Sequence, residues 1–159
     1  MKKTAVFPGS FDPFTIGHEG IVNRALSIFD EIIIAVGSNA MKKCFYSVDD
    51  RKKMIAKAFI GEPRVKVIDY EGLTVDFCRS SGAKFILRGL RTAADFEFER
   101  AIAQVNKVMA PEVESVFILT IPEHSHVNST IIRDIISNGG DASRFVPQAI
   151  KLKDYRRDE

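Results

Sequence analysis

Short apolar runs recur along this chain and are separated by segments in which apolar residues follow a helical spacing. The runs are rich in Val, Ile and Phe with little polar alternation, and they lie at residues 4–7, 32–36, 65–70, 85–87 and 116–121. Runs of this kind are typical of strands that a sheet buries on both faces. We therefore predict five buried strands.

The segments between these runs have the spacing of amphipathic helices. Residues 16–29 and 48–60 each gather four apolar side chains on one side of a helix. A longer amphipathic pattern covers residues 92–110, where Phe96 and Phe98 suit a core or an interface better than a ligand contact. We predict a helix in each of these segments.

Capping residues support the helix starts. Ser47 and Thr92 each precede an aspartate by three residues, close to the capping-box pattern. Asn128 or Ser129 can cap a further helix, and the glycine pair at 139–140 would end it. These signals place helix starts directly after turns.

Strands and helices alternate about five times, without a linker, repeat or low-complexity segment. Because crossovers between parallel strands are right-handed, this order predicts an α/β fold with one doubly wound, five-stranded parallel sheet. We expect a single domain over residues 1–159, with a last helix at 147–155 and a frayed tail at 156–159. In such a sheet, ligands bind beyond the carboxyl ends of the strands.

Composition narrows the class of protein. The 159 residues carry a net charge of +2, too small to indicate nonspecific nucleic-acid binding. No apolar stretch approaches the ~20 residues of a membrane span. A signal peptide would need a longer apolar region than the one at the start of the chain, which Pro8 and Gly9 interrupt. Cys44 and Cys78 lie far apart, which indicates neither a zinc site nor a disulfide scaffold. A reduced, cytoplasmic setting is the simplest interpretation.

The first strand leads into a turn rich in Gly and Pro, and a helix then begins near Thr15. Backbone N–H groups and the helix dipole at this point favour a phosphate, Ser10 adds a hydroxyl donor, and His18 lies in the first helical turn. The alternative is a Pro-rich turn with a capping Thr15 and a solvent-facing His18. The chain contains no P-loop motif, and no GxGxxG follows the first strand.

A second polar cluster, at residues 88–91, follows the fourth strand. Arg88 and Arg91 flank Gly89, and guanidinium groups bind phosphate oxygens in a bidentate fork. The alternative is a surface arginine pair bridged to Asp95 and Glu99. Glu99 could instead point back to the site and accept a hydrogen bond from a ribose or amino group.

Two more polar segments follow strands. Lys42 lies in a loop after the second strand, where an ammonium group would bridge phosphates well. Ser129 and Thr130 open a helix whose N-terminus would point into the same crevice. His124 and His126 have no third ligand at suitable spacing, so we predict no metal site in the protein.

These residues together resemble the nucleotidyltransferases with a [T/H]xGH motif, here at residues 15–18, and with a Ser-Thr-x-x-Arg segment, here at 129–133. Within that group the chain is most similar to the bacterial phosphopantetheine adenylyltransferases. The strings PGSFDPxTxGH at 8–18 and RGLRxxxDFExE at 88–99 carry the resemblance, which covers nearly the whole chain. The second string is the specific one.

The resemblance implies a reaction that joins 4′-phosphopantetheine to ATP and yields dephospho-coenzyme A and pyrophosphate, the penultimate step of coenzyme A synthesis. It implies that Ser10, Lys42 and Arg88 hold the phosphopantetheine phosphate, with Thr74 beside the pantetheine arm. The ATP contacts it implies are Ser10, Phe11, His18, Gly89, Leu90, Arg91, Glu99, His124, Ser125, His126, Val127, Asn128, Ser129 and Thr130. The family usually has a larger aromatic residue at position 124 and Ser at 128. It also implies a homohexamer and feedback by coenzyme A.

A phosphate nucleophile needs no general base, so catalysis reduces to alignment and charge stabilisation. We expect in-line attack on the α-phosphorus without a covalent intermediate, with His18 and Lys42 donating to the developing charge. Arg91 and the helix start at 129–130 would hold the departing pyrophosphate, and Mg²⁺ would be carried on the ATP phosphates. On this interpretation His18 stabilises charge and is not an acid, a base or a metal ligand.

Other functions fit parts of the pattern. On the same scaffold, the chain could be a nicotinamide or nicotinate mononucleotide adenylyltransferase, or a cytidylyltransferase. A nucleotide sensor without catalytic activity would bind ATP and release no pyrophosphate. A scaffolding protein is the weakest alternative, because it would not need so many polar residues at strand ends.

Overall fold

The structure is a computed structural model that describes residues 1–39, 41–155 and 157. In chain order its strands and α-helices are β1 (Thr4–Gly9), α1 (Ile16–Ala25), β2 (Glu31–Gly37), α2 (Val48–Ala58), β3 (Val65–Tyr70), α3 (Thr74–Ser81), β4 (Phe85–Leu90), α4 (Ala93–Met109), β5 (Glu114–Leu119) and α5 (Ser129–Ser137). Short 3₁₀ turns cover Pro122–His124, Ser143–Phe145 and Leu152–Asp154. None of the helices described is long and apolar enough to cross a membrane.

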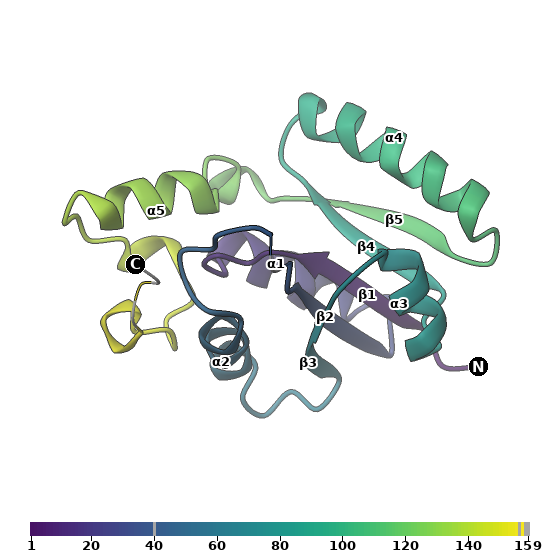
Figure 1. The fold of residues 1–159 in the computed structure, drawn as a ribbon, viewed down its shortest axis with the longest axis horizontal. Helices are drawn as coiled ribbons and strands as arrows, with labels where there is room; N and C mark the ends of the chain where they lie inside the picture. The colour runs from purple at the N-terminus through teal and green to yellow at the C-terminus, as the bar shows by residue number, and fades with distance from the viewer. Residues whose placement is uncertain (40, 156, 158–159) are drawn as a thin grey trace.

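The five strands form one sheet in the order β3-β2-β1-β4-β5, and all neighbours are parallel. The predicted doubly wound parallel sheet is therefore confirmed (Figure 1). The strand order reverses beside β1, because the chain builds outward to β3 and then returns through α3 to β4. This reversal between β1 and β4 is where open α/β sheets form a crevice for ligands.

Side chains alternate across the sheet, and each face has its own core. Phe7 and Ile34 point toward α1 and α2, whereas Val6 and Ile33 pack with the buried side of α3. The buried runs in β1 and β2 have no polar alternation because helices cover both faces. The strands that lead to the site are thus held on two sides.

Helix α4 is covered much less than the others. It lies along β4 and β5 (Figure 1), and the ring of Phe96 meets Phe117 of β5 edge-on at 6.0 Å between centroids. Of the residues in α4, all of which the structure describes, Glu99 is the one that is buried. Most of this helix's apolar side chains, including Phe98 and Val108, are exposed.

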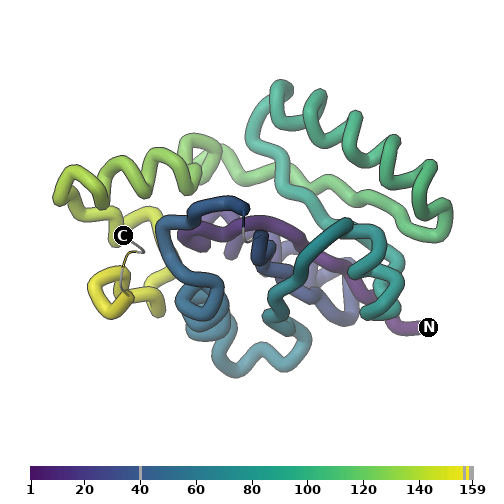
Figure 2. The backbone as a smooth tube through the Cα atoms, in the orientation of Figure 1, coloured from purple at the N-terminus to yellow at the C-terminus, as the bar shows by residue number. Residues whose placement is uncertain are grey.

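Helix α5 and the C-terminal segment pack at the other end of the molecule (Figure 2). Val127, Ile132 and Ile136 form a third apolar cluster, against which Ile16 at the start of α1 packs. This contact brings the N-terminus of α5 beside the N-terminus of α1. Two helix N-termini therefore face the same region.

The predicted caps are confirmed. The hydroxyls of Ser47 and Thr92 accept hydrogen bonds from the backbone N–H groups three residues on, at Asp50 and Asp95. For α5, the side chain of Asn128 is the cap, and Ser129 is the first helical residue. Helix α1 ends earlier than predicted, at Ala25.

Two elements differ from the predicted pattern. Helix α3 has no predicted counterpart, because it is short, lacks a side-chain cap and buries only Val75 and Cys78. The predicted helix at 147–155 is wrong apart from the 3₁₀ turn Leu152–Asp154. There, Ile150, Leu152 and Tyr155 pack on the main core from an irregular chain, since their spacing does not suit one helix face.

The predicted frayed tail is wrong at Arg157. Its backbone pairs with Tyr46 in an antiparallel bridge, and its guanidinium donates to the Ile136 carbonyl at 2.9 Å and lies over the Phe45 ring. Residues 156, 158 and 159, which belong to the same prediction, lie outside the described residues.

Candidate active site

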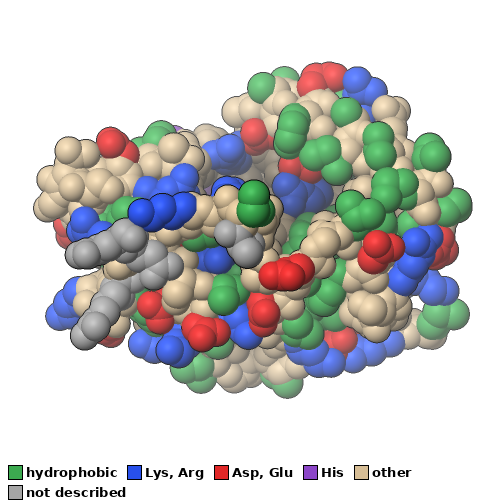
Figure 3. Space-filling model, viewed as in Figure 1, with side chains coloured by type: hydrophobic (Ala, Val, Ile, Leu, Met, Phe, Trp, Pro, Cys, Tyr) green, Lys and Arg blue, Asp and Glu red, His purple; other side chains and the backbone are tan. Residues whose placement is uncertain are grey.

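A cavity of about 340 Å³ opens where β1 and β4 end and where α1 and α5 begin. Figure 3 shows a hollow in the surface between the parts that carry α4 and α5, with Lys and Arg side chains inside it. Polar groups from the end of β1, the end of β4 and the region after β5 line the cavity, among them Ser10, Thr15, His18, Arg88, Arg91, Asn128, Ser129, Thr130 and Arg133. Three of the four segments that the sequence places at strand ends thus converge here, and the fourth, which carries Lys42, lines a neighbouring hollow.

The turn between β1 and α1 forms the floor of this cavity. Phe11 is buried with a φ of 50°, and a Cβ on Gly9 would lie 2.9 Å from the tip of its ring, so only glycine fits at position 9. The buried carboxylate of Asp12 accepts hydrogen bonds from the backbone N–H groups of Phe45 (2.6 Å) and Tyr46 (2.9 Å). This aspartate therefore ties the turn to the loop that carries Lys42.

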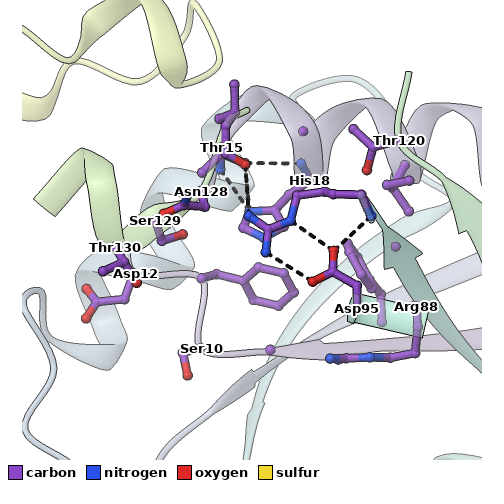
Figure 4. A pocket seen from close by; sticks show the side chains of 18 of the residues that line it. Ser10, Asp12, Thr15, His18, Arg88, Asp95, Thr120, Asn128, Ser129 and Thr130 are labelled. Atoms are coloured by element: carbon purple, nitrogen blue, oxygen red, sulfur yellow. Dashed lines mark hydrogen bonds and ion pairs between the residues drawn. The ribbon is translucent and has the colours of Figure 1, made fainter. Parts of the chain in front are cut away.

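His18 is held at the start of α1 by a capping box (Figure 4). The backbone N–H of Thr15 donates to Nδ1 of His18 at 3.0 Å, and the Thr15 hydroxyl accepts from the backbone N–H of His18 at 3.3 Å. Because Nδ1 accepts, the ring carries its proton on Nε2. Burial, followed by the charges of Arg88 and Arg91, lowers the pKa of His18 to about 3. In the free protein His18 is a neutral ring whose Nε2–H can donate.

Arg88 and Glu99 form a bidentate ion pair at the edge of the cavity. The Nε and Nη2 groups of Arg88 donate to the two carboxylate oxygens of Glu99 at 2.8 and 2.5 Å. Its Nη1 donates to the carbonyl of Pro8 at 2.6 Å. The guanidinium is therefore fixed between β1 and α4.

Arg91 pairs with Asp95 in the first turn of α4. Its Nε lies 3.2 Å from the Asp95 carboxylate, which also accepts from the Arg91 backbone N–H at 2.9 Å. Burial alone would raise the pKa of Asp95, but these hydrogen bonds lower it. The alternative interpretation predicted that the two arginines pair with Asp95 and Glu99, and both ion pairs are present. Both arginines nevertheless line the cavity.

A second cavity, of about 260 Å³, lies between α4 and the ends of β1, β3 and β4. Thr74 and Tyr70 line it and their hydroxyls are 3.0 Å apart, and Asn106 faces it from α4. The two cavities share Ser10, Arg88 and Glu99. They therefore meet at Arg88, in the second half of β4.

Lys42 approaches from a third hollow of about 270 Å³, which Lys43 and Arg133 also line. Its Nζ lies 3.2 Å from the Ser10 hydroxyl, which places an ammonium group where the three hollows meet. Arg133 of α5 donates to the Asp12 carbonyl at 2.7 Å. Together these cations make this corner of the site attractive to anions.

Residues 6–135 match the family model described as Cytidylyltransferase-like. A phosphopantetheine adenylyltransferase of Flavobacterium psychrophilum is 54% identical over 96% of this chain and 100% of its own length, and one of Flavobacterium johnsoniae is 50% identical over 96% and 99%. The chain belongs to the phosphopantetheine adenylyltransferase family. It is therefore a nucleotidyltransferase, as the sequence predicts.

The fold agrees with this family. A bifunctional NMN adenylyltransferase/ADP ribose pyrophosphatase from Francisella tularensis superposes with a TM-score of 0.72 at 21% identity, over 94% of this chain and 46% of its own. At that identity the likeness concerns the fold alone.

Within this adenylyltransferase, most of the predicted ATP contacts line the larger cavity. Besides the residues already described, these are Phe11, Gly89, Glu99 and Val127. Leu90 is buried in the sheet, and the side chains of His124, Ser125 and His126 lie outside the cavity lining. His124 packs beside Gly20 of α1, and His126 meets Phe145 edge-on.

Sequence reasoning missed several residues that line or support the adenylyltransferase site. Asp12 acts through backbone amides 33 and 34 residues away, which no local pattern reveals. Asn106 could have been found, because it lies seven residues after Glu99 and so on the same face of α4. Tyr70 ends β3, and the strand-end rule applied to it as to the other strands.

Among the residues that the structure describes, no group of three or more His, Cys, Asp or Glu side chains is placed to hold a metal ion. The carboxylates at the cavity are already engaged, Glu99 with Arg88 and Asp95 with Arg91.

Proposed function

We propose that this enzyme transfers the adenylyl group of ATP to 4′-phosphopantetheine and forms dephospho-coenzyme A and pyrophosphate. The observation that carries the proposal is the meeting of two cavities at Arg88 and Ser10. A reaction between two phosphate-bearing substrates needs adjoining sites whose phosphate ends face one another. The names of the relatives, at 43–54% identity, support the same acceptor.

ATP occupies the larger cavity in this proposal. Its phosphates lie against the N-termini of α1 and α5, near Ser10, His18 and Arg91, where N–H groups and helix dipoles favour anions. The predicted set of ATP contacts, including residues 89–91 and the stretch 124–130, stays a prediction. Because the side chains of His124, Ser125 and His126 lie outside the lining, that part of the stretch would act through its main chain.

Phosphopantetheine occupies the smaller cavity, with its arm along Thr74 and Asn106. Its phosphate lies at the junction, where Ser10, Lys42 and Arg88 converge. The acceptor phosphate then adjoins the α-phosphate of ATP. Holding both in this geometry supplies much of the catalysis, because alignment turns an encounter of two molecules into an intramolecular step.

A phosphate oxygen of phosphopantetheine attacks the α-phosphorus in line, and the bond to the bridging oxygen of the β-phosphate breaks, so pyrophosphate leaves with its electron pair. No covalent enzyme intermediate forms and no base is needed. Nε2–H of His18 and the ammonium of Lys42 donate to the developing negative charge. Arg91 and the start of α5 hold the departing pyrophosphate. We propose His18, Lys42 and Arg91 as the catalytic residues.

When bound, Mg²⁺ carried on ATP would neutralise part of the negative charge of its phosphates. The absence of a carboxylate cluster in the described residues fits an ion held mostly by phosphate oxygens and water. No protein ligand is assigned to it.

The test is pyrophosphate release from Mg²⁺-ATP with phosphopantetheine or with nicotinate mononucleotide as acceptor. We expect release with phosphopantetheine and formation of dephospho-coenzyme A. Release with nicotinate mononucleotide instead would move the chain to the other adenylyltransferase class. ATP binding without release from either acceptor would support a sensor.

We also propose that residues 1–159 act as one domain in the cytoplasm and assemble as a homohexamer. The exposed apolar side chains of α4, among them Phe98, Val105 and Val108, support self-association, because a patch of this kind marks an interface. Static light scattering of the wild type and of Val105→Glu/Val108→Glu tests this. A wild type that is already monomeric contradicts it. We further propose that coenzyme A inhibits the enzyme by feedback. Measuring pyrophosphate release with added coenzyme A tests this.

A further inference from the structure

Glu99 occupies a position that no other residue of α4 shares. The helix stands over β4 and β5 with the smaller cavity beneath it, and Glu99 is 8% exposed while no other residue of α4 is buried. A lone buried carboxylate on a loosely packed helix is costly unless it is paired. Its partner is Arg88, which contacts both of its oxygens.

The pair forms the wall between the two cavities. Both residues line both cavities, so whatever orients the Arg88 guanidinium orients a donor toward both substrates. Glu99 is thus close to the proposed reaction centre without having to contact a substrate.

Glu99 and the Pro8 carbonyl together engage three of the N–H groups of Arg88. A guanidinium has five N–H donors in a fixed plane. Glu99 takes one on Nε and one on Nη2, and the Pro8 carbonyl takes one on Nη1. These contacts leave one N–H on Nη1 and one on Nη2. A phosphate can accept both.

We propose that Glu99 is a positioning residue, which holds Arg88 in the orientation that offers its two remaining N–H groups to the acceptor phosphate. This inference rests on the proposed function, because it needs an anionic acceptor at Arg88. It differs from the predicted contact between Glu99 and ATP, since it requires Glu99 to act through Arg88. The guanidinium charge attracts the anion in either case, but its direction decides whether the attacking oxygen is in line.

The main variant is Glu99→Gln, which keeps the size of the side chain and one acceptor oxygen but removes the charge and the second acceptor. We expect kcat to fall on the order of 10- to 100-fold, as for other misalignments of reacting groups. KM for ATP should change little, because ATP loses no direct partner. Glu99→Asp keeps the charge on a shorter stem and should recover part of kcat.

A double-mutant cycle decides whether Glu99 acts through Arg88. In an Arg88→Lys background the fork is already lost, so adding Glu99→Gln should change kcat by less than about twofold, the usual scatter of additive effects. If the two effects multiply, Glu99 acts on its own and the proposal is overturned. A rise in KM for ATP with unchanged kcat would also overturn it and would support a nucleotide contact.

Glu97→Gln is the matched control, because Glu97 lies on the same helix, is exposed and pairs with Arg100 at 3.0 Å. It should leave kcat and both KM values unchanged. Thermal unfolding of every variant is measured beside the kinetics. If Glu99→Gln lowers Tm and its kcat per folded molecule equals that of the wild type, the role is structural and the proposal fails.

The wild-type acceptor assay separates this inference from the proposed function. If the wild type uses another phosphate-bearing acceptor, the proposed function fails, and the Glu99 series is run with that acceptor. If the wild type uses phosphopantetheine and the cycle is additive, the proposed function stands and the inference fails.

Discussion

The backbone N–H of Thr15 points at Nδ1 of His18 and donates to it at 3.0 Å. Every substitution of Thr15 other than proline keeps this backbone donor, which holds the histidine in the tautomer with its proton on Nε2. The capping box that starts α1 also prepares this ring to donate toward the cavity. One local motif therefore serves both the helix and the site.

His18→Ala should lower kcat by ~10²–10³, the usual effect of removing a donor to transition-state charge. The fold should survive, because Thr15 still caps the helix through the backbone N–H of residue 18. Steady-state pyrophosphate release, with circular dichroism as the check on folding, measures this. Turnover close to wild type would rule out the proposed role of His18.

The pH dependence of stability follows from the lowered pKa of His18. In the unfolded chain this ring titrates near its ordinary pKa of 6.5, whereas burial, with the charges of Arg88 and Arg91, lowers its pKa in the folded state to about 3. At pH values between these two pKa values, His18 binds a proton in the unfolded state but not in the folded state. The free energy of unfolding therefore falls as pH drops from about 6.5 to about 3. The free energy of unfolding can be measured with urea at several pH values in this window. It should fall less steeply with decreasing pH in His18→Gln than in the wild type.

Thr15→Val removes the capping hydroxyl that also lies 3.1 Å from Nδ1 of His18. We expect the free energy of unfolding to fall by about 1 kcal/mol, and kcat to fall severalfold because the ring is held less firmly. Ser47→Ala is the matched control, since Ser47 caps α2 in the same way. It should cost similar stability and leave kcat unchanged. If the two variants have equal kcat values, the Thr15 hydroxyl does not contribute to catalysis.

Asp12→Asn tests the link between the β1–α1 turn and the Lys42 loop. An amide has one acceptor oxygen, so one of the two backbone N–H groups at Phe45 and Tyr46 would lose its partner, at a cost of about 1–3 kcal/mol. The loop would shift, and KM for phosphopantetheine should rise because Lys42 leaves Ser10. Asp30→Asn is the comparison, because Asp30 accepts a single backbone N–H from Lys3 at an exposed site. An unchanged KM in Asp12→Asn would show that the loop does not depend on this carboxylate.

The parts of the fold that could be predicted are those with a strong local signal. The runs at β1 and β2 are apolar throughout because both faces are covered, and Ser47, Thr92 and Asn128 cap helices through contacts three residues away. Helix α3 carried too weak a signal, with two buried side chains and no cap. The segment after Pro147 was predicted as a helix, but packing of Ile150 and Leu152 on the core decides its path.

The sequence by itself determined the five strands and the helices that follow β1, β2, β4 and β5, and with them the crevice at the strand ends where polar residues gather. Only the tertiary structure decided how those residues are paired. Arg88 meets Glu99 and the Pro8 carbonyl, and Asp12 meets amides of a loop more than thirty residues away. Burial leaves a periodic trace along a chain because it is a property of each residue. A hydrogen bond across crossovers joins two residues whose spacing in sequence carries no period, so it exists only once the sheet has assembled.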